Sequence, residues 1–215
     1  MTFSVLPIYS KKEEIANALT HGLGIFLSIA GLVVLVVFSA IYGDAWKVTA
    51  SAIYGASMIV LYTASTLYHS FSRTRAGAGL NMFDHISIYY LIAGTYTPFV
   101  LVNMRGAWGW SIFGVIWGCA IIGTVLKLIY GNKFRKVSTI IYLCMGWMIL
   151  IAIWPFVKSV ETGGIILVAA GGMAYSLGVI FYKWKSLRFN HAIWHVFVLA
   201  GSVLHFFAVL FYVVL

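Results

Sequence analysis

The sequence predicts an all-α integral membrane protein, a bundle of seven transmembrane helices. Two observations support this fold class. Of the 215 residues, 62% are hydrophobic and only 9% are charged, which is far from the composition of a soluble globular domain. The chain also divides into seven long runs without Asp, Glu, Lys or Arg. Each run is long enough for a membrane-spanning helix of about 20 residues.

These seven runs account for nearly the whole chain. Their bounds are 15–43, 48–72, 85–104, 106–126, 137–157, 162–182 and 189–215. The segments between them leave no room for a second domain or a soluble catalytic module. We therefore expect residues 1–215 to form one membrane domain, with residues 1–17 as a cytoplasmic N-terminal tail.

Local features support the individual helices in turn. The first run is too long for the core of a signal peptide and should persist as a helix. Pro98 lies inside the third run, where it should bend the helix or leave a carbonyl without its partner. Gly114 and Gly118 in the fourth run, and Gly171 and Gly172 in the sixth, are small residues of the kind that let membrane helices pack closely.

The positive charges predict the orientation of the bundle. Eleven of the fourteen basic residues lie in the tail and in the segments 70–83, 127–136 and 183–190. Only Lys47, Arg105 and Lys158 lie at the opposite ends of the runs. Because cytoplasmic loops retain Lys and Arg, we expect a cytoplasmic N-terminus and an external C-terminus in the cell membrane. The net charge of +9 therefore reflects topology, and no nucleic-acid partner is expected.

Ionisable residues gather at the ends of four runs. His191 and His195 begin the last run, and His69 ends the second. Asp84 and His85 stand at the start of the third run, and His21 near the start of the first. All six positions fall on the side predicted to be cytoplasmic. Because ionisable side chains in a membrane cost free energy and normally have partners, this layer is the expected functional site.

The histidine spacing is compatible with a metal site. His191 and His195 are four residues apart, so they share a helix face and lie about 6 Å apart along the axis. His69 is the natural third ligand, from another helix at matching depth. Three imidazoles and a water form the open tetrahedral geometry of a catalytic zinc. The alternative is a hydrogen-bonded pair of histidines at a helix interface.

Asp84 is the acid that we expect in this layer. Residues 192–194 contain no Glu, so the base of an HExxH metalloprotease is missing. Asp84 could take a proton from water or orient a ligand, and the alternative is a carboxylate that only favours a helix N-terminus. The other acids are expected in the tail or the outer loops, and they are Glu13, Glu14, Asp44 and Glu161.

Ser65 is the second candidate catalytic residue, because it precedes His69 by one helical turn. Its hydroxyl could equally bond a carbonyl of its own helix. His205 lies ten residues beyond His195, about 15 Å deeper, and is expected to be buried outside the metal site. His21 and His85 have the right depth, but the sequence does not fix which way they face.

Five motifs in order carry a resemblance to a known family. They are "NALTHGLG" at 17–24, "STLYH" at 65–69, "FDHISIYYLIAGTYTPF" at 83–99, "HAIWH" at 191–195 and "GSVLHFFAV" at 201–209. Over about residues 12–215 the chain resembles the progestin and adipoQ receptor family, specifically its bacterial hemolysin III branch. This resemblance implies an intramembrane zinc near the cytoplasmic face, held by His69, His191 and His195, with Ser65 and Asp84 beside it.

The resemblance also suggests functions. Related membrane proteins include alkaline ceramidases, which implies zinc-dependent hydrolysis of a lipid amide or ester. One alternative is a pore-forming, cytolytic hemolysin, although only scattered polar residues lie deep in the runs. Another is a lipid sensor or receptor with structural zinc. Membrane lipid is the expected substrate or ligand, and no protein partner is predicted.

Overall fold

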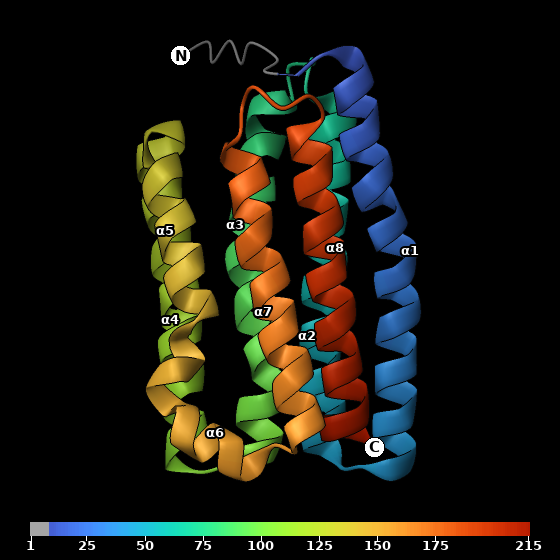
Figure 1. The fold of residues 1–215 in the computed structure, drawn as a ribbon, viewed down its shortest axis with the longest axis vertical. Helices are drawn as coiled ribbons and strands as arrows, with labels where there is room; N and C mark the ends of the chain where they lie inside the picture. The colour runs from blue at the N-terminus through green and yellow to red at the C-terminus, as the bar shows by residue number, and fades with distance from the viewer. Residues whose placement is uncertain (1–8) are drawn as a thin grey trace.

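The computed structural model describes residues 9–215, and those residues form a bundle of helices without strands (Figure 1). The α-helices are α1 (Lys11–Tyr42), α2 (Ala45–Phe71), α3 (Gly77–Pro98), α4 (Ala107–Tyr130), α5 (Arg135–Gly146), α6 (Ile153–Ser159), α7 (Thr162–Lys183) and α8 (Asn190–Val209). Short π-helices cover Phe99–Asn103 and Leu210–Val214, and 3₁₀-helices cover Gly131–Phe134 and Met148–Ala152.

Within residues 9–215, seven segments are long and apolar enough to cross a membrane. Six of them are single helices or a helix with a π-helical end, and the fifth combines α5 and α6. The predicted fold class, an all-α bundle of seven membrane helices, is therefore confirmed. The beginning of α1 and the end of the chain lie at opposite ends of the bundle, as an odd number of crossings requires (Figure 1).

Two prolines interrupt regular helix. The fifth span changes from α5 to a 3₁₀ segment before α6 begins, two residues ahead of Pro155. Proline has no N–H to donate to the carbonyl four residues earlier, so an unbroken α-helix cannot pass through this position. At Pro98, α3 ends and continues as the π-helix Phe99–Asn103. The disturbance expected at Pro98 thus takes the form of a change in helix type.

α1 and α3 begin four and eight residues before the uncharged runs that predicted them. The Ser10 and Glu13 side chains each accept a hydrogen bond from the other's backbone N–H, and this capping box starts α1 at Lys11. Residues 11–17, expected in the tail, are therefore helical. α3 begins at Gly77, so Asp84 lies well inside the helix. A charged residue ends an uncharged run, but a helix ends where its backbone loses its hydrogen bonds.

Glycines contribute to packing at some of the predicted positions. A Cβ atom added to Gly171 would overlap the His205 ring, so α7 and α8 are in close contact there. Around Gly114 and Gly118, no described atom lies within 4 Å of such a Cβ. The close packing expected at these two glycines of α4 is therefore not found within the described chain.

The helices divide into a core group and an outer pair. α1 packs on α2 and on α8, α3 packs on α2, and α7 packs on α8. Hydrogen bonds from Tyr54 and Tyr62 to Ser202 join α2 to α8. α4 packs on α3 and carries α5 at the outer edge of the bundle (Figure 1). This arrangement brings the ends of α1, α2, α3 and α8 that carry the ionisable residues together at one end of the molecule.

Candidate metal centre

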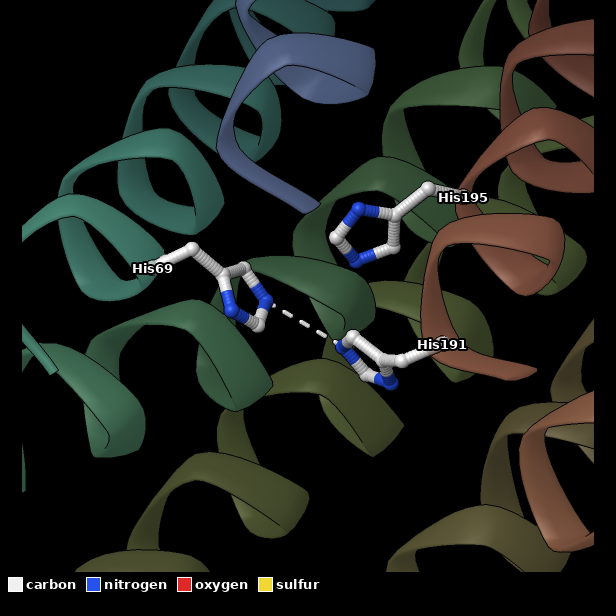
Figure 2. Close-up of side chains that lie close together, drawn as sticks. All are labelled: His69, His191 and His195. Atoms are coloured by element: carbon white, nitrogen blue, oxygen red, sulfur yellow. Dashed lines mark hydrogen bonds between the residues drawn. The ribbon is translucent and has the colours of Figure 1, made fainter. Parts of the chain in front are cut away.

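Three histidines meet at one end of the bundle, as the sequence predicted. His69 comes from the last turn of α2, and His191 and His195 come from the first two turns of α8. Each offers one nitrogen, and the three nitrogens lie within 4.8 Å of one another (Figure 2). All three side chains are buried. The group is therefore close enough to hold a metal ion.

One nitrogen of each ring lies toward a common space. His69 Nε2 and His191 Nε2 are 3.2 Å apart (Figure 2). The other nitrogen of His69 is occupied by Glu14, whose Oε2 lies 2.6 Å from Nδ1. The other nitrogen of His195 donates to the Asn17 carbonyl at 3.1 Å. Nε2 of His69 and of His195 is thus the atom left for a ligand bond.

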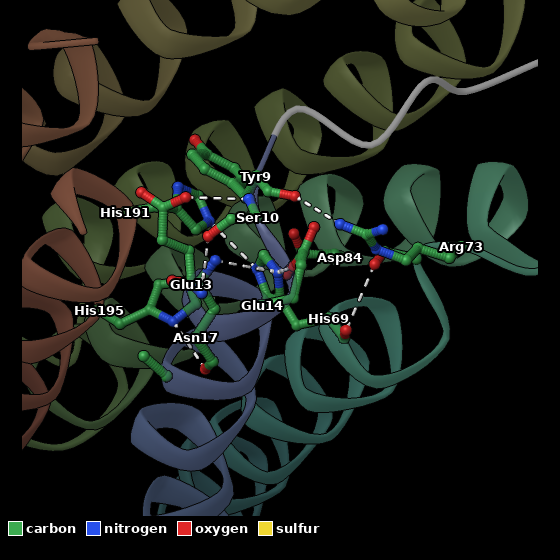
Figure 3. Close-up of polar contacts among 12 residues, drawn as sticks. Tyr9, Ser10, Glu13, Glu14, Asn17, His69, Arg73, Asp84, His191 and His195 are labelled. Carbon is green, nitrogen blue, oxygen red and sulfur yellow. Dashed lines mark hydrogen bonds and ion pairs between the residues drawn. The ribbon is translucent and has the colours of Figure 1, made fainter. Parts of the chain in front are cut away.

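The first turns of α1 and Tyr9, which precedes the helix, contact the three histidines (Figure 3). Besides Glu14 and Asn17, the Tyr9 ring stacks on His191 at a centroid distance of 5.0 Å. The His21 ring stacks on His195 at 3.5 Å. The N-terminal part of α1, with Tyr9 before it, therefore forms part of the surroundings of the histidine group.

The expectation that Glu14 belongs to the tail is wrong. The capping box starts the helix at Lys11, and Glu14 then lies on the inward face, 5% exposed. The sequence did contain a signal for this. The buried positions of α1 repeat every three or four residues and begin with polar residues, namely Glu14, Asn17, His21, Gly24 and Ser28. In a membrane helix such a polar stripe marks the face turned away from lipid.

Asp84 and Ser65 are brought to the same place. Both are buried and line a cavity together with His191 and His195. Because Asp84 lies inside α3, the alternative that it caps the helix does not hold. The Ser65 hydroxyl has no hydrogen-bond partner among residues 9–215, so the alternative bond to its own helix is also not found.

The remaining histidines lie outside the metal-ligand group. His85 Nδ1 donates to the Asn81 carbonyl at 2.8 Å, and His205 Nδ1 donates to the Gly201 carbonyl at 2.8 Å. His205 is buried deeper in the bundle, as its distance along α8 predicted. His21 is buried, and neither of its ring nitrogens has a hydrogen-bond partner in the described part of the chain.

The cavity beside the histidines is long and mostly apolar. Its volume is about 220 Å³. At one end it is lined by Ser65, Asp84, His191 and His195, and at the other by Phe99 and Phe156. Asp84 and Phe99 are 15 residues apart on one span, which corresponds to about 22 Å of helix axis. The cavity thus joins a polar end to a deep apolar interior.

Tyr9, which stacks on His191, is held by hydrogen bonds from two basic side chains. Its carbonyl accepts a hydrogen bond from Arg73 at 3.0 Å (Figure 3). Its hydroxyl accepts one from Lys185 at 3.2 Å. Burial raises the pKa of Tyr9. Partial burial, together with the nearby charge of Arg135, lowers the pKa of Lys185. Tyr9 therefore stays a neutral phenol at physiological pH.

The start of α8 is anchored by Glu13. Phe189 adopts a left-handed conformation with φ of 57°, which is unfavourable for a bulky side chain. Its N–H donates to Glu13 Oε1 at 3.1 Å. This bond helps to hold the turn that places His191 two residues later.

Comparison with known proteins defines the family. The family model described as haemolysin-III related matches residues 9–206, a range that includes all three histidines of the group. The chain belongs to the haemolysin-III-related family. This confirms the resemblance to the hemolysin III branch of the progestin and adipoQ receptor family. It is also consistent with a multi-pass protein of the cell membrane.

This haemolysin-III-related protein is similar to several relatives over most of their length. Hemolysin-3 of Bacillus cereus is 48% identical over 202 residues, which is 94% of this chain and 92% of the relative. A hemolysin-3 homolog of Bacillus subtilis (strain 168) is 47% identical over 207 residues, 96% of this chain and 97% of the relative. Human monocyte to macrophage differentiation factor is 30% identical over 203 residues, which is 92% of this chain and 83% of the relative.

Proposed function

We propose that this haemolysin-III-related protein is a zinc-dependent hydrolase of a membrane-lipid amide or ester. The observation that supports the proposal most is the position of the three-histidine group. It lies at the polar end of a long apolar cavity, next to a buried carboxylic acid and a buried hydroxyl. A lipid can place its acyl chain in such a cavity and its polar linkage beside the histidines.

The residues fit a zinc ion. His69, His191 and His195 would hold it through neutral imidazole nitrogens. Tetrahedral zinc with bonds of about 2.0–2.1 Å separates its ligand atoms by roughly 3.3 Å. His69 Nε2 and His191 Nε2 are separated by 3.2 Å. When bound by three imidazoles, zinc supplies Lewis acidity, which activates water and polarises a carbonyl.

Asp84 and Ser65 supply the remaining groups. In this proposal the Asp84 carboxylate takes the proton from the attacking water and then delivers it to the departing amine or alcohol. The Ser65 hydroxyl, which bonds no carbonyl of its own helix, donates a hydrogen bond to the substrate at the same end of the cavity. Both roles are assigned because Ser65 and Asp84 line the same cavity, although they come from different helices.

Access from the membrane supports a lipid substrate. The cavity is bounded by residues of α5 and α6 on one side and of α7 on the other, including Leu143, Ile153 and Val168. α5 is packed on α3 and α4, and a hydrogen bond of 3.0 Å from Trp147 to Ser176 links its far end to α7. An acyl chain can enter sideways through this weakly packed side, without crossing water.

A pore through a single chain has less support. The deep threonines Thr95, Thr97 and Thr124 each donate to a carbonyl of their own helix, at 2.7–2.8 Å. Their hydroxyls therefore serve the helix backbone and do not line a polar conduit. The name hemolysin belongs to the relatives, and it is not evidence for a pore in this chain.

Metal content and lipid turnover of the purified protein test the proposal. We expect about one zinc per chain in the wild type, as a three-histidine site holds one ion, together with release of a fatty acid or amine from membrane lipid extracts. His191→Ala should lose both properties. His205→Ala should keep the metal, because His205 lies outside the histidine group.

Full metal loss in His205→Ala would show that the proposed metal site is wrong. Bound zinc without any lipid turnover would favour a structural role of the metal in a sensor.

A further inference from the structure

The carboxylate of Glu14 is buried among neutral groups, which do not compensate a negative charge. It is 5% exposed, and its Oε2 atom lies 2.6 Å from His69 Nδ1. No Lys or Arg nitrogen of residues 9–215 lies within 4 Å of it. Its second oxygen, Oε1, has no hydrogen-bond partner in the same part of the chain. A buried carboxylate without a cation is costly, so a positive charge is expected nearby.

The contact with His69 determines how that histidine presents itself. An ionised carboxylate only accepts hydrogen bonds, so His69 Nδ1 must carry the hydrogen. Its Nε2 then has the lone pair and faces His191 Nε2 at 3.2 Å. Asn17 Nδ2 also lies near His69 Nδ1, but at 3.4 Å it is the weaker neighbour. Glu14 is therefore the group that sets the ring orientation of His69.

Charge balance points to the same assignment. Three neutral imidazoles leave the two positive charges of a divalent metal uncompensated in a buried site. Among the described residues, the two buried carboxylic acids near the histidines are Asp84 and Glu14. A carboxylate hydrogen-bonded to the outer nitrogen of a ligand histidine raises the basicity of that ligand and fixes its ring. A metal ion held by the three histidines would thus supply the positive charge that balances Glu14, and Glu14 would supply negative charge that balances the ion.

We infer that Glu14 is a positioning residue of the metal centre, which holds His69 through Nδ1 and supplies one of the two negative charges that balance the ion. This inference rests on the metal site of the proposed function. It does not require hydrolysis, because its effect is on metal affinity.

The test is metal affinity at fixed pH, measured on the full-length protein by competition with a chelator for Zn²⁺. Glu14→Gln keeps the shape of the side chain and removes its charge, and it should bind Zn²⁺ about 10–100-fold more weakly, the usual effect of removing such an outer partner. Co²⁺ loaded into the same variant should show a changed absorption spectrum, because the His69 ring is no longer fixed. Glu161→Gln at the opposite end of the bundle removes the same charge and should leave both readouts unchanged.

The outcomes separate the two proposals. If Glu14→Gln binds Zn²⁺ as tightly as the wild type and gives the same Co²⁺ spectrum, the inference is wrong while the metal site stands. If the wild type binds no metal, both fail. If Glu14→Gln weakens binding but the wild type hydrolyses no lipid, the inference stands and the proposed reaction does not. Helical circular dichroism of the metal-free variant shows whether it is folded, and Glu14→Asp, which keeps the charge, should recover part of the affinity.

Discussion

At the scale of single residues, the environment of a side chain decided its role more than its type did. Asp84 and Glu14 are both carboxylic acids and both buried. Asp84 lines the cavity, where a substrate can reach it, whereas Glu14 contacts the outer nitrogen of His69. The first position suits proton transfer and the second suits holding a ligand.

Asp84→Asn should keep most of the bound metal, because three imidazoles remain, and lose lipid turnover by about 10²-fold or more, the usual scale for acid–base help. The measurement is hydrolysis rate per bound zinc. Asp44→Asn is the matched control, because Asp44 caps α2 at the far end of the bundle and Asn caps almost as well. Unchanged hydrolysis by a metal-loaded Asp84→Asn protein would exclude the proton-transfer role.

At the scale of helices, α1 has its polarity reversed relative to a helix of a soluble protein. Its large apolar side chains face outward, with Leu19 and Phe26 exposed, and its buried face carries Glu14, Asn17 and His21. Lipid solvates the outer face, and neighbouring helices satisfy the inner one. Close approach to α2 is possible because Gly24 lies directly against the Tyr62 ring.

Gly24→Ala should therefore destabilise the protein. A methyl group at this position overlaps the Tyr62 ring, and overpacking of this kind costs about 1–3 kcal/mol. Thermal unfolding in detergent should show a lower Tm. Gly118→Ala adds a carbon that meets no neighbouring side chain or helix within 4 Å, so it should not lower the Tm, and the higher helix propensity of Ala should stabilise the protein by up to about 1 kcal/mol. Equal Tm values for the two variants would mean that α1 and α2 are not packed as described.

At the scale of the whole molecule, the functional layer lies at one end of the bundle. The histidine group comes from the end of α2 and the start of α8. These helix ends lie with the start of α1 at one end of the bundle (Figure 1). The same end carries the connections α2–α3, α4–α5 and α7–α8, which are rich in Lys and Arg. By the distribution of positive charge, this end is predicted to be cytoplasmic.

Reporter fusions test that orientation. Fusions after Arg75 and after Leu187, in the connections before α3 and before α8, should read cytoplasmic, and a fusion at the C-terminus should read external. The reason is the concentration of eleven of fourteen basic residues on one side. A cytoplasmic signal from the C-terminal fusion would contradict either the orientation or the count of seven crossings.

The sequence by itself determined the seven membrane spans and the grouping of His69, His191 and His195. The spans and the pairing of His191 with His195 follow from local properties, because apolar run length measures a membrane crossing and a spacing of four residues defines a helix face. His69 joined this pair through its matching depth in another run and through the family resemblance. Only the tertiary structure placed Glu14 against His69 and Tyr9 against His191, pairs separated by 55 and by more than 180 positions in the chain. The contacts of α1 depend on where its capping box starts the helix and on which helices pack beside it. A one-dimensional pattern contains the polar stripe of α1, but the neighbours that give each polar residue its partner exist only in the folded bundle.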